Sequence, residues 1–520
     1  MKKKLIPISF AILAMTACED NNEICQSEII VESDDITNII ELTQKEYSVL
    51  STLSRTSTKI KEEEVREIIS DFKGNKYLGN KIVPIIKNKG IGKSSEADKD
   101  TALYVVGSEN NEGWAVISGD VRLPETILAY SDEGSVDDVV CDESFTIFMD
   151  YLVNYYDSCI TNFETEKDSL IDIIYEKSGL ETDFSTSLSK KQIAPSLSNT
   201  DIIDEWSTST NWYNTFSIGP LVPVTWKQRG EYNDVLQKNK GKDYRLGCTS
   251  LATAQLMAYW KFPNNMHANG ILIDWDAITS WPDIEYFDDN TKLQIQTLCY
   301  VLSGFCNTTY MKNNSMSLPK NSLGVLSDLG YHVPDDFIQY TKNRVENSIR
   351  EKTPLIAYGA NKVTKGWSIA ISIATAGIVN TTIPQHVWLI DRFTRQEMIT
   401  TKYVTYRDRY NYYGSKEIAL SKKAINPANP QKPSNTPKND NGKEKYSTVT
   451  MVYRTSSTKD LIHMNWGWGD KLSSCWYLAD VFNCSDAYKS DKKGFQRDAE
   501  VQHDEKFSKV HIATSIHPKQ

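Results

Sequence analysis

The chain has 520 residues, of which 40% are hydrophobic and 24% are charged. At about 150 residues per domain, this length predicts two to four globular domains. The 58 basic and 68 acidic side chains give a formal charge of -10, which argues against a nucleic-acid-binding protein, because such proteins usually carry a basic face. Beyond the N-terminus no run approaches about 18 apolar residues, so we expect no membrane-spanning helix.

The first twenty residues have the pattern of a secretory signal. Lysines at 2–4 precede an apolar stretch over 5–15, and the small residues at 16–17 stand directly before Cys18. This arrangement resembles the lipobox of bacterial lipoproteins, in which the cysteine is lipidated and becomes the new N-terminus. We therefore predict a protein that is secreted across the inner membrane and anchored by acyl chains on Cys18. The acidic pair at 19–20 resembles an export tag for the cell surface, and a plain signal peptide is the alternative.

A small α+β domain is predicted over residues 41–184, after a signal peptide at 1–17 and a polar spacer at 18–40. Its expected elements are a helical region over 42–72 with Thr43 as a cap, strands over 102–107 and 113–119, a further strand near Ile127, and a helix over 144–159. The two strands are joined by a turn, which indicates a hairpin.

A linker over residues 185–205 is rich in Ser, Lys and Pro, which is typical of an exposed connector that proteases can reach. Lys190–Lys191 is a candidate cleavage site within it. The larger domain is predicted over 206–520, with an insertion at about 395–458. The insertion contains a low-complexity patch over 426–445, which we interpret as a solvated loop at the tip of an extended hairpin.

Cys248 is the candidate nucleophile. It follows Gly247 in R-L-G-C-T-S-L-A-T-A-Q-L-M-A-Y-W-K-F-P, where apolar residues keep helical spacing up to Pro263. A cysteine in the first turn of a buried helix meets free N–H groups and the positive end of the helix dipole, so we expect a lowered thiol pKa. The alternative is a small core residue, as most free cysteines are.

Seven histidines are available as a base. His386 opens H-V-W-L-I-D, a strand that ends in Asp391, and an imidazole on a rigid strand suits a general base. His332 is expected to cap or pack at a helix end. The three histidines from His503 onward are expected in a polar tail. The alternative for His386 is a surface histidine at a sheet edge.

The third segment is H-M-N-W-G-W-G, from His463 to Gly469. Asn465 can hydrogen-bond the imidazole and fix its tautomer, and Trp466 can shield that bond from water. His463 is a rival base, but it lies too close to Asn465 on the same strand face to be that residue's partner.

Together the three segments resemble the motifs of the streptopain family of cysteine peptidases. The family reads G-C-x-A-T-A-x-A-Q, G-H-A-x-V-x-D-G and H-x-N-W-G-W-G in this order, and this chain has G-C-T-S-L-A-T-A-Q, Q-H-V-W-L-I-D-R and H-M-N-W-G-W-G. Gly219 to Asn233 resembles the family's mature start. The small domain, with Y-V-V-G and G-W-A-V-I-S-G-D, is similar to the family's inhibitory pro-domain.

The resemblance implies an α+β protein in which the pro-domain precedes a papain-like catalytic domain with a helical lobe and an antiparallel β lobe. It also implies a zymogen of a cysteine endopeptidase with Cys248 as nucleophile, His386 as base, and Asn465 and Trp466 as orienting residues. Protein or peptide substrates are then expected. The resemblance also implies a preference for a bulky apolar side chain on the substrate residue that directly precedes the one whose carbonyl is attacked. No cofactor, metal or nucleic-acid partner is expected. The expected inhibitor is the pro-domain of the same chain.

For the mechanism, the backbone N–H of Cys248 is expected to donate to the oxyanion. Gln228 and Gln237 are the two candidates for the second donor. Three departures from the family motifs bear on activity: Gln385 and Arg392 replace glycines, and the segment between His386 and Asn465 is several times longer than usual.

These departures keep two other functions open. One is a catalytically weak relative that acts as a surface binding lipoprotein. The other is a papain-like amidase or acyltransferase that acts on cell-wall or small-molecule substrates. Nine cysteines are present, and if Cys18 is lipidated and one other is catalytic, the odd remainder cannot all pair in disulfides. No Cys-x-x-Cys or Cys/His metal spacing occurs, so we predict no structural zinc.

Overall fold

The structure is a computed structural model, and the residues that it describes are 39–53, 55–73, 81–88, 99–107, 113–137, 143–178, 202–210, 212–241, 244–311, 314–359, 367–369, 386–408, 447–467, 475–482 and 510–519. Several predictions lie outside these ranges. They concern the signal with Cys18, the dibasic pair Lys190–Lys191, Gln385 and the low-complexity patch over 426–445.

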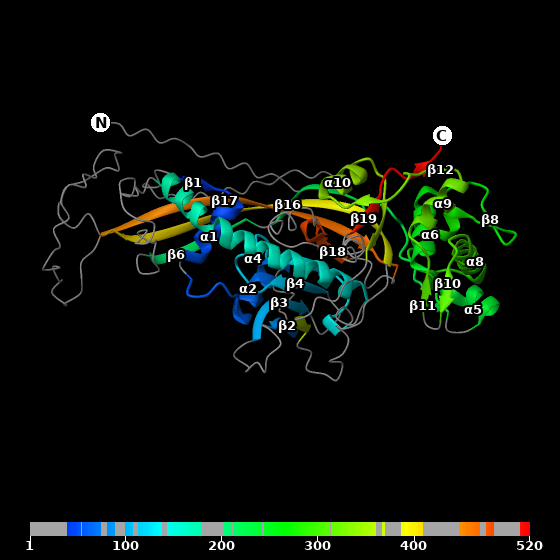
Figure 1. Cartoon of the computed structure of the whole chain (residues 1–520), viewed down its shortest axis with the longest axis horizontal. Helices are drawn as coiled ribbons and strands as arrows, with labels where there is room; N and C mark the ends of the chain where they lie inside the picture. Colours follow the sequence, from blue (N-terminus) through cyan, green and yellow to red (C-terminus); the bar gives the residue numbers. More distant parts are fainter. Residues whose placement is uncertain are drawn as a thin grey trace, which may run out of the picture. The chain divides into compact units, whose positions relative to one another are not determined.

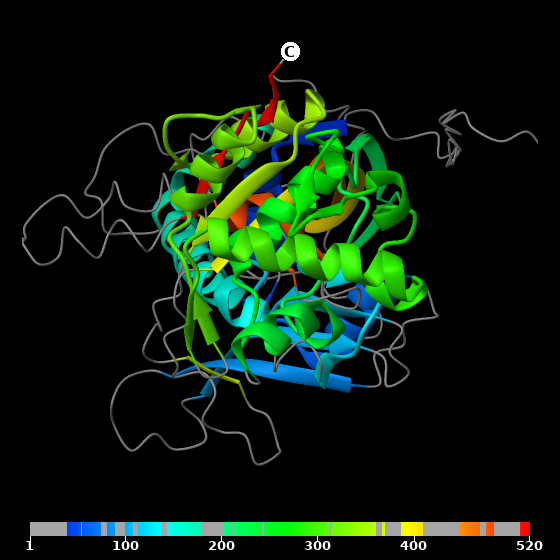
Figure 2. The same ribbon diagram turned by 90° about the vertical axis from the view of Figure 1, so that its right-hand side faces the viewer.

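A group of helices forms the first half of the larger domain (Figure 1, and face-on in Figure 2). It consists of α5 (Asp234–Lys240), α6 (Cys248–Trp260), α7 (Trp275–Ile278), α8 (Asp289–Phe305) and α9 (Lys320–Asp328), with the 3-10 turns η3 (Gly230–Asn233) and η4 (Ile284–Tyr286). Short strand pairs lie between them: β8 (His267–Ala268) with β9 (Ile271–Leu272), and β10 (Thr309–Met311) with β11 (Asn314–Met316). Side-chain caps begin several of these helices; for example, Asp288 accepts a 2.9 Å bond from the Thr291 N–H at the start of α8.

The strands of the second half of the larger domain are antiparallel neighbours in one large sheet. In sheet order they are β13 (Ile338–Gln339), β19 (His511–Ala513), β14 (Leu355–Gly359), β16 (His386–Asp408), β17 (Ser447–Asn465) and β18 (Cys475–Leu478), with the turn η7 (Ala479–Phe482) following β18. The helix α10 (Lys342–Arg350) packs against β16. A separate small pair joins β12 (Tyr331–His332) to β20 (His517–Pro518).

The polar tail predicted after His503 is therefore wrong for its last part. His511 lies in β19, which pairs with β14, and His517 lies in β20. The ring of His517 stacks on that of His332 at 4.9 Å. Short strands of two or three residues carry too little periodicity to be recognised in a polar sequence.

The small domain is α+β, as expected. Its elements are β1 (Ile39–Leu42), α1 (Gln44–Leu53), α2 (Glu62–Lys73), β2 (Lys81–Asn88), β3 (Lys99–Gly107), β4 (Trp114–Ser118), β5 (Ile127–Ser131) and α4 (Glu143–Lys177). The strands β1 and β2 were not predicted, and α1 and α2 divide the single helical region expected over 42–72. The cap predicted at Thr43 is confirmed: its hydroxyl accepts from the Glu46 N–H at 3.3 Å, and the Glu46 carboxylate accepts from the Thr43 N–H at 2.8 Å. This reciprocal pair is a capping box.

The helix α4 is much longer than the predicted 144–159, with 35 residues in all. Its second half is largely polar, which hid it from a periodicity argument. Phe163 and Ile174 from this half are buried in a small core with Leu50 of α1 and with Val404 and Tyr453 of the strands β16 and β17. Tertiary packing therefore extends the helix beyond the segment that its own sequence predicts.

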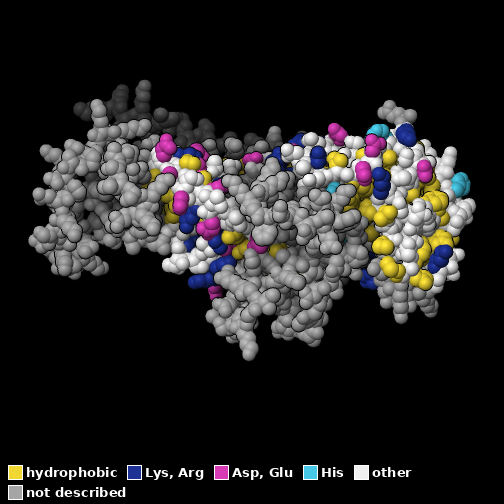
Figure 3. Space-filling view, in the orientation of Figure 1, with side chains coloured by type: hydrophobic (Ala, Val, Ile, Leu, Met, Phe, Trp, Pro, Cys, Tyr) yellow, Lys and Arg dark blue, Asp and Glu magenta, His cyan; other side chains and the backbone are white. Residues whose placement is uncertain are grey.

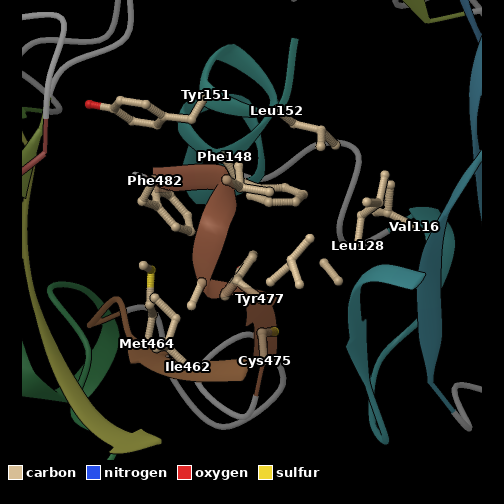
Figure 4. Packing of buried hydrophobic residues seen from close by; sticks show 14 of the residues in the cluster. Val116, Leu128, Phe148, Tyr151, Leu152, Ile462, Met464, Cys475, Tyr477 and Phe482 are labelled. Atoms are coloured by element: carbon tan, nitrogen blue, oxygen red, sulfur yellow. The ribbon is translucent and has the colours of Figure 1, made fainter. Parts of the chain in front are cut away.

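The small domain and the β lobe share one sheet. Strand β5 pairs antiparallel with β18, so that the order β18-β5-β4-β3-β2 continues the sheet of the larger domain, and β15 (Trp367–Ile369) pairs with β2 at the far side. They also share one core, in which Phe148, Tyr151 and Leu152 of α4 lie over Tyr477 and Phe482 (Figure 4). Residues 39–520 accordingly form one compact unit.

The predicted insertion forms a long antiparallel hairpin of β16 and β17. The hairpin carries three further strands on its edges: β6 (Ile202–Ser209) and β7 (Tyr213–Ile218) pair with β16, and β1 pairs parallel with β17. The extended hairpin that we expected is therefore present, and it pairs with both the first strand of the small domain and the segment that follows the domain. None of the helices that the structure describes is long and apolar enough to cross a membrane.

Candidate active site

Cys248 is the first residue of α6, as predicted. Gly247 precedes it in an extended conformation, and a Cβ added there would come within 3.2 Å of two atoms of the Thr308 side chain. A larger residue at this position would therefore require the Thr308 side chain to shift by a few tenths of an ångström. The next turn closes with a 3.0 Å bond from the Leu251 N–H to the Gly247 carbonyl.

The thiol pKa departs from the expectation. Burial raises the pKa of Cys248 above its ordinary value, although hydrogen bonds from the backbone N–H groups of Val387 and Thr249 act in the opposite direction. The predicted lowering by the helix start is thus present as a contribution, but desolvation outweighs it. In this state the thiol is the favoured form at neutral pH.

His386 is the first residue of β16 and lies opposite Gly359 on the neighbouring strand β14. Its Nε2 is 3.0 Å from the carbonyl oxygen of Trp466. Because a carbonyl only accepts, Nε2 carries the proton in this contact, which leaves the Nδ1 lone pair of a neutral imidazole as the basic site. The rings of Trp388 and Trp466 stack beside the imidazole at 6.1 and 5.9 Å.

Burial also controls the imidazole. It lowers the pKa of His386 to about 4, while the bond to Trp466 acts to raise it. The thiol and the imidazole are therefore both shifted toward their uncharged forms. A thiolate–imidazolium pair needs more solvent, or a closer partner, than this state provides.

Cys248 and His386 are connected through the backbone of the residue that follows His386. The Val387 N–H, which hydrogen-bonds the Cys248 thiol, belongs to the residue directly after His386. Strand β16 thus brings the predicted base to the N-terminus of the helix that carries the predicted nucleophile. Val387 and Leu389 pack from this strand into the core of the helices.

Asn465 and Trp466 lie in the same place, at the end of β17. The Asn465 amide nitrogen donates to the Val224 carbonyl at 2.8 Å and to Gln255 Oε1 at 3.0 Å, and its oxygen accepts from the Gly467 N–H at 3.2 Å. These three bonds join the amide to two backbone groups and to a side chain of α6, and none of them reaches the imidazole. The expected bond between Asn465 and the His386 imidazole therefore stays a prediction. Trp466 is 1% exposed and its ring stacks beside the imidazole, while the shielding of a bond between Asn465 and the imidazole stays a prediction.

The two candidate oxyanion donors differ in their surroundings. Gln228 is 5% exposed, its backbone N–H donates to the Gly467 carbonyl at 3.3 Å, and its Nε2 has no hydrogen-bond partner among the described residues. A buried amide that lacks a partner costs free energy, which is tolerated where a ligand supplies the acceptor. Gln237 lies on α5 and is linked to neither α6 nor Gly467 by the hydrogen bonds of the described residues.

Two polar contacts were not predicted. His463 Nδ1 lies 2.6 Å from Asp391 Oδ1, so the rival base is paired with the acidic residue that ends H-V-W-L-I-D. Asp391 sits at a bulge in β16 and also accepts from the Val222 N–H at 3.2 Å. The other is the bond between Gln255 and Asn465; both residues stand in the quoted motifs, but nothing in either motif indicates that they touch.

Arg392, which replaces a motif glycine, contacts Trp476 and Ser217 and not Cys248 or His386 in the interactions of the described residues. Its guanidinium lies 4.4 Å from the centre of the Trp476 ring and donates to the Ser217 hydroxyl at 3.3 Å. Within the described ranges, no group of three or more His, Cys, Asp or Glu side chains is arranged to hold a metal ion.

Comparisons with known proteins agree with the motifs. Residues 226–404 match the Peptidase C10 family, which is the streptopain family, and residues 57–155 match the Spi protease inhibitor family. Both matches lie inside the ranges predicted for the two domains, whose boundaries stay predictions. A comparison with curated proteins found no match.

Two solved structures from Prevotella intermedia are similar at low identity. A fragment of prointerpain A is 14% identical with a TM-score of 0.38, over 84% of this chain and 99% of that chain. The active interpain A cysteine protease is 16% identical with a TM-score of 0.26, over 35% of this chain and 82% of that chain.

The family matches, and not these distant likenesses, support the assignment. The chain carries a peptidase domain of the C10 family behind a segment of the Spi protease inhibitor family, and it is a cysteine-type endopeptidase.

Proposed function

We propose that the protein is the zymogen of a lipid-anchored, secreted endopeptidase, with Cys248 as nucleophile and His386 as base. One observation carries the assignment of the site: the thiol at the start of α6 accepts from the N–H of Val387, the residue that follows His386, whose imidazole is held by the Trp466 carbonyl through Nε2. This leaves Nδ1 as the nitrogen that takes the proton of the thiol.

The proposed reaction has two stages. The Cys248 sulfur attacks the peptide carbonyl carbon, the carbon–nitrogen bond breaks, and His386 gives the proton to the leaving amine. Water then attacks the thioester, His386 takes a proton from it, and the carbon–sulfur bond breaks to restore the thiol. The N–H of Cys248 and the Nε2 of Gln228 are proposed to donate to the oxyanion. Among the described residues Gln228 Nε2 has no hydrogen-bond partner, which supports this role for Gln228 over one for Gln237.

The contact between α4 and the sheet supports latency. A Cβ added at Gly359, opposite His386, would come within 2.6 Å of the Tyr151 hydroxyl and 3.1 Å of the Trp388 ring. Tyr151 of the small domain therefore lies close to Gly359, on the strand that pairs with the strand of the proposed base. We propose that this packing keeps water from the imidazole, and that removal of residues 41–184 restores the solvation that the charged pair needs.

Protein or peptide chains are the proposed substrates. The strand pair β10–β11 lies at the nucleophile, because the Ser315 hydroxyl donates to the Leu246 carbonyl at 3.1 Å. Next to it Met316 and Leu318 are 53% and 66% exposed, and hydrophobic side chains gather over the helices in Figure 3. These side chains support a preference for a bulky apolar residue near the scissile bond.

The anchor is tested by fractionation and labelling. We expect the parent and a Cys25→Ser control to incorporate a fatty-acid probe and to enter the detergent phase, whereas Cys18→Ser does neither. Equal labelling of all three proteins would remove the lipid anchor from the proposal.

The peptidase site is tested with an iodoacetamide probe on the folded chain before and after removal of the small domain. Cys248 is expected to react much faster after removal, and Cys248→Ala is expected to lose both the label and the cleavage of casein. Cys306→Ala, which removes another free cysteine from the core of the helices and is present before and after removal of the small domain, is the matched control. A processed, folded protein that leaves Cys248 unmodified and casein intact would favour the binding-protein alternative.

A further inference from the structure

A single peptide group separates Asn465 from the imidazole. The Trp466–Gly467 peptide accepts from His386 Nε2 at its carbonyl oxygen, at 3.0 Å, and donates from its N–H to Asn465 Oδ1, at 3.2 Å. The same peptide plane is thus held at both ends, by the imidazole on one side and by the amide on the other. Gly467 has φ +76°, which permits this turn.

The amide of Asn465 is itself held in one orientation. Its nitrogen donates to Gln255 Oε1 and to the Val224 carbonyl, and both of these atoms only accept. An amide flipped by 180° would face two acceptors with its oxygen and would face the Gly467 N–H with its nitrogen. The acceptors therefore force Oδ1 toward the peptide that binds His386.

Gln255 connects this chain of bonds to the nucleophile. It lies two turns after Cys248 on α6, it is 1% exposed, and its Oε1 also accepts from the Trp226 N–H at 3.1 Å. Gly467 approaches the same helix, since a Cβ there would lie 2.7 Å from Leu251 Cδ2. Direct hydrogen bonds through Gln255 and Asn465 thus link the helix that carries the proposed nucleophile to the peptide that holds the proposed base.

We propose that Gln255 is a further positioning residue, which fixes the amide of Asn465 and thereby holds the His386 imidazole through the Trp466–Gly467 peptide. The proposal rests on His386 being the base of the proposed function. Donation from the Gly467 N–H to Asn465 polarises the peptide and makes the Trp466 carbonyl a stronger acceptor for Nε2–H. The relay therefore favours the imidazole tautomer with the proton on Nε2 and keeps Nδ1 available for the thiol proton.

The test compares Gln255→Leu with Gln294→Leu as a matched control. Gln294 is also a buried helical glutamine, and its Oε1 accepts from the Asp274 N–H at 2.7 Å, but it lies on α8 and belongs to no part of the relay. Gln255→Glu keeps an acceptor oxygen at position 255 and is the rescue variant. Asn465→Ala, which removes the acceptor of the Gly467 N–H, is an independent second variant if Gln255→Leu does not fold.

The readout is the ring nitrogens of His386 by long-range proton–nitrogen correlation in the full chain, assigned with a His386→Gln sample. The parent, Gln294→Leu and Gln255→Glu are expected to hold the Nε2–H tautomer, whereas Gln255→Leu or Asn465→Ala shifts the ring toward a tautomer mixture. In processed protein the same two variants are expected to lower kcat at least tenfold with KM unchanged.

A folded Gln255→Leu or Asn465→Ala protein with the imidazole signals of the parent would overturn the proposal. This outcome differs from failure of the proposed function, because the tautomer is read without any turnover. If Cys248→Ala cleaves substrate as well as the parent does, the assigned chemistry fails, while the tautomer shift still decides whether the relay exists.

Discussion

The helices and the sheet of this protein stand in different relations to the small domain. The core of the helices is built from residues 222–356 with contributions from β16 and the C-terminal segment, and it contains no residue of the small domain. The core beneath the sheet mixes catalytic strands with residues of the small domain, among them Phe148 and Tyr151. The proposed nucleophile belongs to the first region and the proposed base to the second.

This difference indicates where an inhibitory segment acts. Removal of the small domain strips packing from the strands beside His386, whereas the core that holds α6 keeps all of its members. We therefore expect maturation to change the environment of the imidazole more than the position of the sulfur. Burial shifts the pKa values of the Cys248 thiol and the His386 imidazole toward their uncharged forms. These shifts agree with a latent state in which too little solvent reaches the site to stabilise the charged pair.

The largest effect is expected for Cys248→Ala. It removes the nucleophile without altering either core, and peptide hydrolysis by processed protein is expected to fall by at least about 10³-fold. Cys299→Ala, in the core of the same helices, is the control and should retain activity in its folded fraction. Steady-state assays on casein check this, and retained hydrolysis in Cys248→Ala would exclude this cysteine.

Gln228→Ala is expected to have the next largest effect. Loss of one oxyanion donor typically lowers kcat by about 10²–10³-fold, and KM should change little because the donor acts on the transition state. Gln237→Ala on α5 is the matched control, with an expected change below about twofold. Equal losses in both variants would show that the unpartnered amide of Gln228 serves another purpose.

Two core truncations sharpen the comparison between the regions. Phe148→Ala in the shared core and Leu298→Ala in the core of the helices should each lower the free energy of unfolding, by about 3–5 and 2–5 kcal/mol respectively. Only Phe148→Ala is expected to speed probe labelling of Cys248 in the full chain, because only it loosens the segment that covers the base.

Chemical denaturation and labelling rates measure the two effects separately. If Leu298→Ala speeds labelling as much as Phe148→Ala does at equal loss of stability, latency is a matter of global stability and not of the shared core.

Local sequence patterns were sufficient to predict part of the site and some elements of the fold. The start of α6 at Cys248, the strand that begins at His386 and the cap at Thr43 follow from spacing and residue type, and each is present. Such features depend on neighbours within one turn or one strand, so a single sequence contains most of the information.

The remaining features depend on contacts between distant segments. The pairing of β5 with β18, the approach of Tyr151 to the strand next to that of the base, and the bond between Gln255 and Asn465 join residues that no periodicity relates. The direction of the Cys248 pKa shift was missed for the same reason, since desolvation by the folded core exceeds what the helix start contributes.

The most direct test of latency at a Cys248–His386 site is the pH dependence of iodoacetamide labelling of Cys248. Burial raises the thiol pKa in the full chain, so labelling should increase with pH and reach its midpoint above the ordinary pKa of a cysteine. After removal of residues 41–184, the midpoint is predicted to move to lower pH as the imidazole gains water and charge. An unchanged midpoint in folded, processed protein would contradict this account.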